Sequence, residues 1–263
     1  LRKWLSEDRN DFGRDVIPAM LDGGARVYGY HFDGYWQDVG TIQSYWEANL
    51  ALLEDHAALD LYDRDWTIHT RSEERAPAQV GPTAQVHRSL ISHGCVINGT
   101  VVNSVLSPGV RVDVGAVVRD SIVMFDSVIR SGAVVDRAIL DKEVVVGPGA
   151  IVGDGPDFDT PNRQEPGRLN TGITVVGKRA IIPRGVRIGR NVKIAGNVKA
   201  NDFVSRMVKT GASIEPGHGK RGSRAAAEKR LAVPIEPSTN GHREAKVVGG
   251  ANRVAAGASP VED

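Results

Sequence analysis

A six-residue spacing of small aliphatic residues, running from about Ser104 to Ile194, constrains the fold more than any other feature of this sequence. A helix repeats about every 3.6 residues and a strand about every two, so neither produces this pattern. A six-residue repeat is typical of a parallel β-helix, in which each hexad contributes one short strand and one turn. We therefore expect the residues at this spacing to point inward and to stack on those of neighbouring coils: Val110, Ala116, Ile122, Val128, Val134, Leu140, Val146 and Val152.

The same frame continues after an interruption, because Val152 and Val176 are separated by four whole hexads. It then runs through Ile182, Ile188 and Ile194. The intervening stretch, from Gly153 to Gly172, is dense in Gly, Pro, Asn and Asp, and this composition predicts a surface loop extruded from the β-helix.

The composition limits the partners and the compartment. The chain carries 33 basic and 32 acidic side chains, a balance that indicates neither a nucleic-acid nor a membrane partner. No apolar run approaches the roughly 20 residues of a membrane span. The single cysteine, Cys95, excludes an internal disulfide framework, suits the cytoplasm and is predicted to be a core residue.

The sequence divides into four parts. Residues 1–56 do not follow the hexad rule and predict a piece of an α/β domain, and residues 57–82 predict a connector. Residues 83–216 predict the β-helix. Residues 217–263 are rich in Gly, Ala, Lys, Arg and Ser, which predicts a disordered tail. Because the chain opens on Leu1 instead of Met, we also expect a preceding segment.

Local signals predict the elements of residues 1–56. Asp15 is expected to cap a short helix that ends at Gly23 and Gly24. The alternating aromatic residues of 26–32 predict a strand. Thr41 is expected to cap a second helix, whose apolar side includes Trp46.

Two short motifs in this part contain candidate site residues. In GYWQDVGT at 34–41, the carboxylate of Asp38 could hold a divalent cation while the following helix start faces a phosphate. The alternative is an ordinary loop in which Trp36 only packs. In DFGRDVIP at 11–18, Asp11 and Asp15 could bind a cation or sugar hydroxyls, although the local pattern favours helix capping.

Together, five stretches of this sequence resemble a known family. They are DFGRDVIP, GYWQDVGT, SYWEANL at 44–50, SLISHGCVINGTVVNSVLSPGVRV at 89–112 and AILDKEVVVGPGAIVG at 138–153. In order and spacing they are similar to the carboxy-terminal part of bacterial glucose-1-phosphate adenylyltransferases, over about residues 9–216. The resemblance implies an α/β nucleotidyltransferase domain followed by a left-handed β-helix built from hexapeptide repeats.

The resemblance also implies a reaction. Glucose 1-phosphate attacks the α-phosphate of ATP, giving ADP-glucose and pyrophosphate for glycogen or α-glucan synthesis, with Mg²⁺ neutralising the phosphates. By the same resemblance Asp38 is a Mg²⁺ ligand. Trp36, Gly40 and Thr41 line the sugar-phosphate side, and Asp11 is a further candidate for substrate binding.

Several parts of such an enzyme are not found in these 263 residues. The glycine-rich nucleotide loop, a second metal-binding aspartate and a lysine for the sugar phosphate lie upstream in the family. We therefore expect a fragment, or one piece of a split gene, that does not catalyse alone. Two alternatives are a non-catalytic β-helix subunit and a hexapeptide-repeat acyltransferase that uses His87 or His93 as a general base.

Regulation and assembly are also implied by the resemblance. Lys142, in AILDK, matches a basic position that the family uses for an anionic effector, and its alternative is a solvated corner lysine. Arg111 and Arg130 are expected on other corners. The family's enzymes are commonly homotetramers. Neither the effector nor the nucleotide and sugar specificity follows from the sequence.

Overall fold

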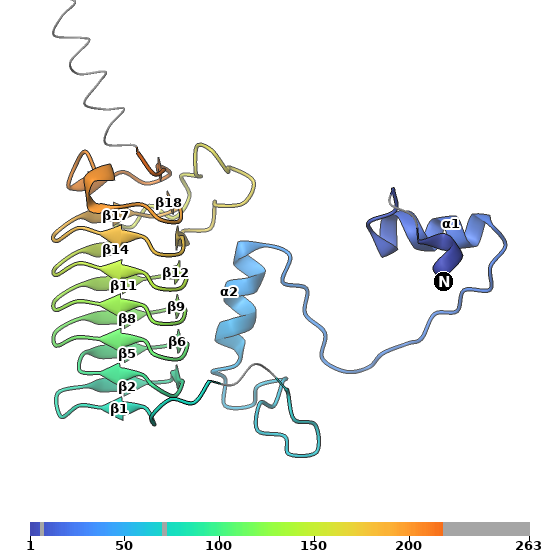
Figure 1. The fold of residues 1–263 in the computed structure, drawn as a ribbon, viewed down its shortest axis with the longest axis horizontal. Coiled ribbons are helices and arrows are strands. Elements are labelled where there is room, and N and C mark those ends of the chain that lie inside the picture. Colours follow the sequence, from blue (N-terminus) through green and yellow to red (C-terminus); the bar gives the residue numbers. More distant parts are fainter. Residues whose placement is uncertain (6–7, 70–72, 218–263) are drawn as a thin grey trace, which may run out of the picture. The chain divides into compact units, whose positions relative to one another are not determined.

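The computed structural model describes residues 1–5, 8–69 and 73–217, and its main body is a parallel β-helix (Figure 1). Three parallel sheets form its sides. The first sheet contains β1 (Gln79–Val80), β4 (Val96–Ile97), β7 (Arg111–Val112), β10 (Val128–Ile129), β13 (Val145–Val146) and β16 (Ile181–Ile182). The second contains β2 (Gln85–His87), β5 (Thr100–Val102), β8 (Val117–Arg119), β11 (Val134–Asp136), β14 (Ile151–Asp154), β17 (Arg187–Gly189) and β19 (Met207–Val208). The third contains β3 (Leu90–Ile91), β6 (Val105–Leu106), β9 (Ile122–Val123), β12 (Ala138–Leu140), β15 (Thr174–Val176), β18 (Lys193–Ile194) and β20 (Ser213–Ile214).

The fold is thus the predicted β-helix, but the strict six-residue frame is wrong in its middle. The paired residues Val112, Ile129 and Val146 are 17 positions apart, one fewer than three full hexads. In these two coils one corner is therefore a residue shorter than the rule assumes. As a result Ile122, Val128 and Val134 each fall one position before an inward residue.

The residues that follow these three fill the core. Val123, Ile129 and Val135 are completely buried among the stacked coils. Val128 and Val134 are only half-buried, and Ile122 belongs to a separate apolar cluster outside the core. Cys95 is fully buried, as predicted.

The short corner lies between the second and third sheets. Asn103, Asp120 and Arg137 occupy it in successive coils, each with a left-handed backbone at φ 45°, 48° and 46°. The next residue in the first two coils is a buried serine, Ser104 or Ser121. The Ser104 hydroxyl donates to the Val102 carbonyl (2.7 Å) and accepts the Ser121 amide (3.1 Å), so the serines satisfy corner backbone groups between coils.

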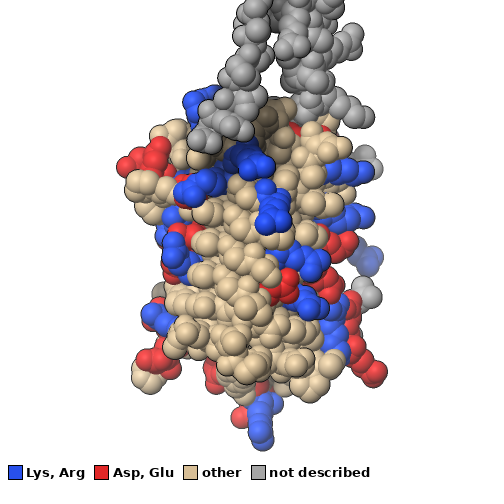
Figure 2. Space-filling model, turned by 90° about the vertical axis from the view of Figure 1, so that its left-hand side faces the viewer, with Lys and Arg blue, Asp and Glu red and all other residues tan. Residues whose placement is uncertain are grey.

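Charged side chains of both signs lie along the borders of a broad uncharged area on one side of the β-helix (Figure 2). No helix among the described residues has the length and apolar character needed to cross a membrane.

Irregular structure predominates before the β-helix. The chain before the β-helix contains a 3₁₀ turn (Arg2–Trp4), a π-helical turn (Phe12–Val16) and the helices α1 (Ile17–Asp22) and α2 (Ile42–Ala51). A further 3₁₀ turn (Ala200–Asp202) lies near the carboxy-terminal end of the β-helix. The first strand begins at Gln79, four residues before the expected boundary at 83. The predicted disordered tail, residues 217–263, lies outside the described part except for Gly217.

Two expectations for residues 1–33 are wrong. Asp11, not Asp15, caps the first helical segment, because its carboxylate accepts the Arg14 amide (2.7 Å), whereas Asp15 pairs with the Arg14 guanidinium (2.9 Å). The helix does end at Gly23, as predicted. Residues 26–32 form no strand, since no other described strand pairs with them, and Tyr28 and Tyr30 are 82% and 90% exposed.

The second helix is confirmed with its cap. The Thr41 hydroxyl accepts the Ser44 amide (3.0 Å) and completes a capping box. The apolar residues Ile42, Tyr45 and Trp46 pack against the outer cluster on the β-helix, which consists of Ile122, Ile139 and Ile173. α2 is thereby attached to the third sheet.

Candidate functional site

The segment 34–41 leads directly into α2 and contains the candidate metal ligand. One carboxylate oxygen of Asp38 accepts the Gly40 amide at 3.0 Å. A Cβ at Gly40 would lie 3.2 Å from that oxygen, so glycine lets the carboxylate fold closely over the backbone. The structure thus brings Asp38, Gly40 and Thr41 together at the start of α2, while Trp36 is 75% exposed.

The residues present fit part of a Mg²⁺ site. Among the described residues, no three His, Cys, Asp or Glu side chains gather in a way that could hold a metal ion alone. Protein-bound Mg²⁺ commonly uses one or two carboxylates and completes its shell with water and substrate phosphates. Asp38 has one oxygen engaged by Gly40, and its second oxygen accepts no hydrogen bond within the described ranges. A single Mg²⁺ ligand is the role that this geometry suits.

Asp11 has a local structural role. Its carboxylate caps the π-helical turn through the Arg14 amide, and its own amide donates to Asp15 (3.1 Å). Capping is therefore what the structure shows for Asp11, and substrate binding stays a prediction.

Lys142 lies in a groove of about 630 Å³ along the corner between the third and first sheets. The groove is lined by Glu73, Arg75, Ser92, His93, Pro108, Phe125, Asp126, Lys142, Glu143 and Lys178.

The charges of this groove are mostly paired. Arg75 contacts Glu73 (2.7 Å) and Asp126 (2.6 Å), and its hydrogen bond lowers the pKa of Asp126. Lys178 contacts Glu143 at 3.3 Å. Within the described part Lys142 has no ion pair, and its ammonium lies 5.8 Å from the centre of the Phe125 ring. Its charge is therefore available to an anion.

The other basic and histidine candidates lie in ordinary surroundings. Arg111 and Arg130 both contact Asp113, at 3.0 and 3.6 Å. His87 ends β2 and is exposed, and His93 is an exposed residue of the Lys142 groove. No observation on the described residues favours a general base at either histidine.

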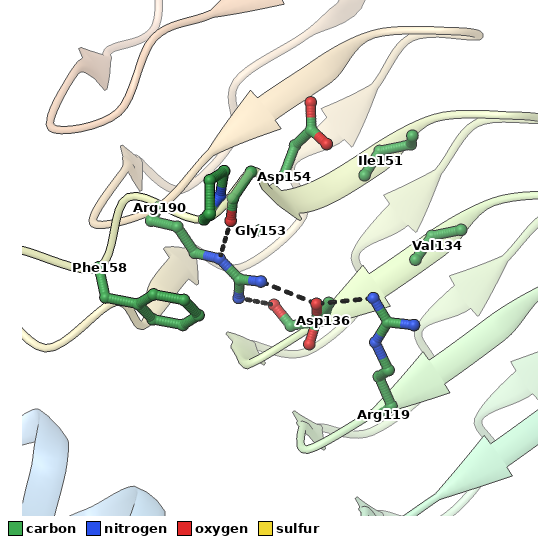
Figure 3. Close-up of a pocket in the computed structure, with 10 residues that line it drawn as sticks. Arg119, Val134, Asp136, Ile151, Gly153, Asp154, Phe158 and Arg190 are labelled. Atoms are coloured by element: carbon green, nitrogen blue, oxygen red, sulfur yellow. Dashed lines mark hydrogen bonds and ion pairs between the residues drawn. The ribbon is translucent and has the colours of Figure 1, made fainter.

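Sequence reasoning missed a charged cluster where the inserted loop leaves the second sheet (Figure 3). Asp136 accepts hydrogen bonds from Arg119 (2.9 Å) and Arg190 (2.8 Å). The Arg190 guanidinium also donates to the Gly155 carbonyl (3.0 Å) and lies 4.6 Å from the centre of the Phe158 ring. Because Asp136 and Arg190 are 54 residues apart, no local pattern could have indicated this cluster.

The cluster makes a testable contribution to stability. Burial raises the pKa of Asp136, but the hydrogen bonds from Arg119 and Arg190 outweigh burial, so the pKa lies below its ordinary value. A carboxyl of this kind stabilises the fold above its unfolded pKa of about 3.9, and the contribution is lost as the pH falls through the lower folded pKa. Asp136→Asn should lower the free energy of unfolding by about 3 kcal/mol at pH 7.

Urea unfolding from pH 7 down to pH 3 checks this prediction. The difference between the native sequence and Asp136→Asn should stay constant down to about pH 5 and shrink below about pH 4. A difference that does not change over this range would show that the ionised carboxylate is not what stabilises the cluster.

Two family models match this chain, one over the residues before the β-helix and one over most of the β-helix. Residues 3–55 match the nucleotidyl transferase family model, and residues 76–176 match the model for the GlmU-like C-terminal hexapeptide. The first match contains Asp11, Trp36, Asp38, Gly40 and Thr41. The second covers most of the β-helix.

Curated relatives extend over both matches. The glucose-1-phosphate adenylyltransferase of Thermomicrobium roseum is 61% identical over 207 residues, covering 78% of this chain and 48% of the relative. Those of Acetivibrio thermocellus and Pseudothermotoga lettingae are 42% and 40% identical, over 80% and 78% of this chain and 49% of each relative. This chain spans about half the length of these relatives. It is thus similar to glucose-1-phosphate adenylyltransferases over a nucleotidyl transferase segment and a hexapeptide β-helix segment.

Proposed function

We propose that this chain supplies the carboxy-terminal part of an enzyme that forms ADP-glucose and pyrophosphate from ATP and glucose 1-phosphate. The observation that carries the proposal is the 61% identity to a glucose-1-phosphate adenylyltransferase over 207 residues. At that identity the fold and the local geometry of a site are expected to be shared. The product would feed glycogen or α-glucan synthesis.

Each candidate residue then has a defined task. Asp38 would be a ligand of Mg²⁺, which supplies charge neutralisation for the phosphates when bound. The Gly40 amide holds the Asp38 carboxylate in place. Thr41 caps α2, whose amino-terminal end favours a phosphate because its first backbone N–H groups point outward. Trp36 and Asp11 would contact the sugar phosphate.

The exposed aromatic residues near the site support an enzyme assembled from more than this chain. Tyr28, Tyr30, Phe32 and Trp36 are 82%, 90%, 58% and 75% exposed. A cluster of large apolar side chains that is open to water usually belongs to an interface. In the proposed enzyme the remaining part of the nucleotidyltransferase domain covers these residues.

The Lys142 groove is proposed to bind a small anionic effector. The Lys142 ammonium lies beside Phe125 and forms no ion pair with any other described residue, which supports this assignment. By family resemblance we further infer a homotetramer in the cytoplasm.

A chimera tests the proposed function. The part of the Thermomicrobium roseum relative that this chain does not match is fused ahead of this chain, and pyrophosphate release is measured with ATP, glucose 1-phosphate and Mg²⁺. We expect turnover from the chimera that requires both substrates, and none from this chain alone. The intact relative serves as the positive control.

A chimera that folds, with a cooperative melting transition, and yet releases no pyrophosphate would contradict the proposal. That result would favour a non-catalytic β-helix subunit.

A further inference from the structure

The indole of Trp46 fixes α2 to the β-helix from two directions. Its ring N–H donates to the Asp120 carbonyl at 2.8 Å, on the short corner between the second and third sheets. The guanidinium of Arg137, from the same corner one coil further on, lies 4.3 Å from the centre of the ring. Trp46 is therefore held both by its edge and by its face.

Arg137 also contacts the inserted loop. Its Nε donates to the Thr171 carbonyl at 3.1 Å, and its guanidinium lies 5.9 Å from the centre of the Phe158 ring. Burial is the main cause that lowers the pKa of Arg137, and the neighbouring charge of Arg190 adds to this. Among the described residues Arg137 forms no ion pair. Its charge is held by aromatic faces and a carbonyl, so its position depends on both α2 and the loop.

Hydrogen bonds from two asparagine side chains hold the loop 155–172 against the β-helix. The side-chain amide of Asn191 donates to the carbonyls of Phe158 (2.9 Å) and Thr160 (2.8 Å), and its oxygen accepts the Gly172 amide (2.7 Å). The amide of Asn162, in the loop itself, donates to the carbonyls of Asn191 and Ala212, both at 2.9 Å. Both asparagines are fully buried. The loop is therefore tied to the coils that contain Asn191 and Ala212, in addition to the coil of Arg137.

We propose that Arg137 is a positioning residue that couples the loop 155–172 to α2, and through α2 fixes the segment 34–41 that carries Asp38. Trp46 follows Thr41 by five positions, which corresponds to about 7.5 Å along a helix. A helix of this length moves as one body, so the contact that anchors Trp46 also sets the place of Thr41 and the turn before it. The inference rests on the proposed function only for its kinetic consequence.

The chain offers a matched pair of variants for the test. Arg137→Asn removes the guanidinium but keeps the left-handed backbone conformation of the corner. Asn103 adopts this conformation at the equivalent corner, at φ 45°, and asparagine tolerates it. Arg179→Asn is the control. Arg179 has the same backbone conformation, at φ 59°, and is an exposed arginine on another corner.

Amide hydrogen exchange of the whole chain is the first measurement. Arg137→Asn should speed exchange about tenfold in residues 42–51 and in the loop 155–172, and leave β12 unchanged. Arg179→Asn should change neither segment. Unchanged protection of α2 in Arg137→Asn would overturn the proposal.

A second variant separates coupling from general destabilisation. Asn162→Ala loosens the loop, and in the native background it should also speed exchange in α2. In the Arg137→Asn background it should speed exchange in the loop without a further change in α2, because the connection is already broken. Additive effects of the two substitutions on α2 would mean that Arg137 does not carry the coupling.

The kinetic consequence is measured in the chimera. We expect Arg137→Asn to raise the KM for glucose 1-phosphate about tenfold at an unchanged melting temperature, since the segment beside the sugar phosphate is displaced. A residue that only supports folding would lower kcat through the active fraction and leave KM unchanged. If the parent chimera has no turnover, the proposed function fails, and hydrogen exchange still decides the coupling.

Discussion

Asp38→Asn should lower the kcat of the chimeric enzyme by about 100-fold or more, with little effect on its melting temperature. The substituted side chain keeps a carbonyl oxygen that can accept the Gly40 amide, so the turn before α2 should persist. What it loses is the negative charge, and with it a strong ligand for Mg²⁺. The expected effect therefore falls on the chemistry and not on the fold.

The measurement is kcat as a function of Mg²⁺ concentration, with thermal unfolding of each variant alongside. Asp33→Asn is the matched control: Asp33 lies directly before the segment 34–41, is exposed, and pairs with His31 at 3.0 Å. This control should retain the parent's Mg²⁺ dependence. Turnover close to the parent's in Asp38→Asn would remove Asp38 from the metal site.

The features that depend only on residues close together along the chain were predictable from the sequence. The β-helix repeats along the chain, and the Asp38, Gly40 and Thr41 turn lies within four residues. The cap of α2 was predicted for the same reason, because Thr41 needs only Ser44. The strand expected at 26–32 failed on this criterion, since a strand depends on a partner that no local pattern supplies.

Long-range contacts were not predictable. Trp46 meets the Asp120 carbonyl across 74 residues, and Arg190 meets Asp136 across 54. Both contacts depend on how many residues each coil contains, and the one-residue shortening at the Asp120 corner cannot be seen in a six-residue count. That shortening also decides whether Ile122 or Val123, the two residues of β9, faces the core.

The same substitution, to aspartate, should therefore unfold the β-helix at Val123 but not at Ile122. Val123 is fully buried and pairs with Leu106 and Leu140 of the adjacent coils. Val123→Asp would place a carboxylate without a partner between them, which should lower the free energy of unfolding by about 3–5 kcal/mol. Because each coil is supported only by its neighbours, a defect of this size in a middle coil should abolish the cooperative unfolding of the β-helix.

Ile122→Asp should leave the β-helix folded and release α2. Ile122 lies on the outer side of β9, where Ile42, Tyr45 and Trp46 cover it, so a carboxylate there regains water once α2 departs. Circular dichroism melting should show a transition close to the native one for Ile122→Asp and none for Val123→Asp. Amide exchange should be fast in residues 42–51 of Ile122→Asp. Loss of the β-helix transition in Ile122→Asp would instead restore the strict six-residue frame, in which Ile122 faces the core, and would remove the anchored position of α2 on which the role of Arg137 depends.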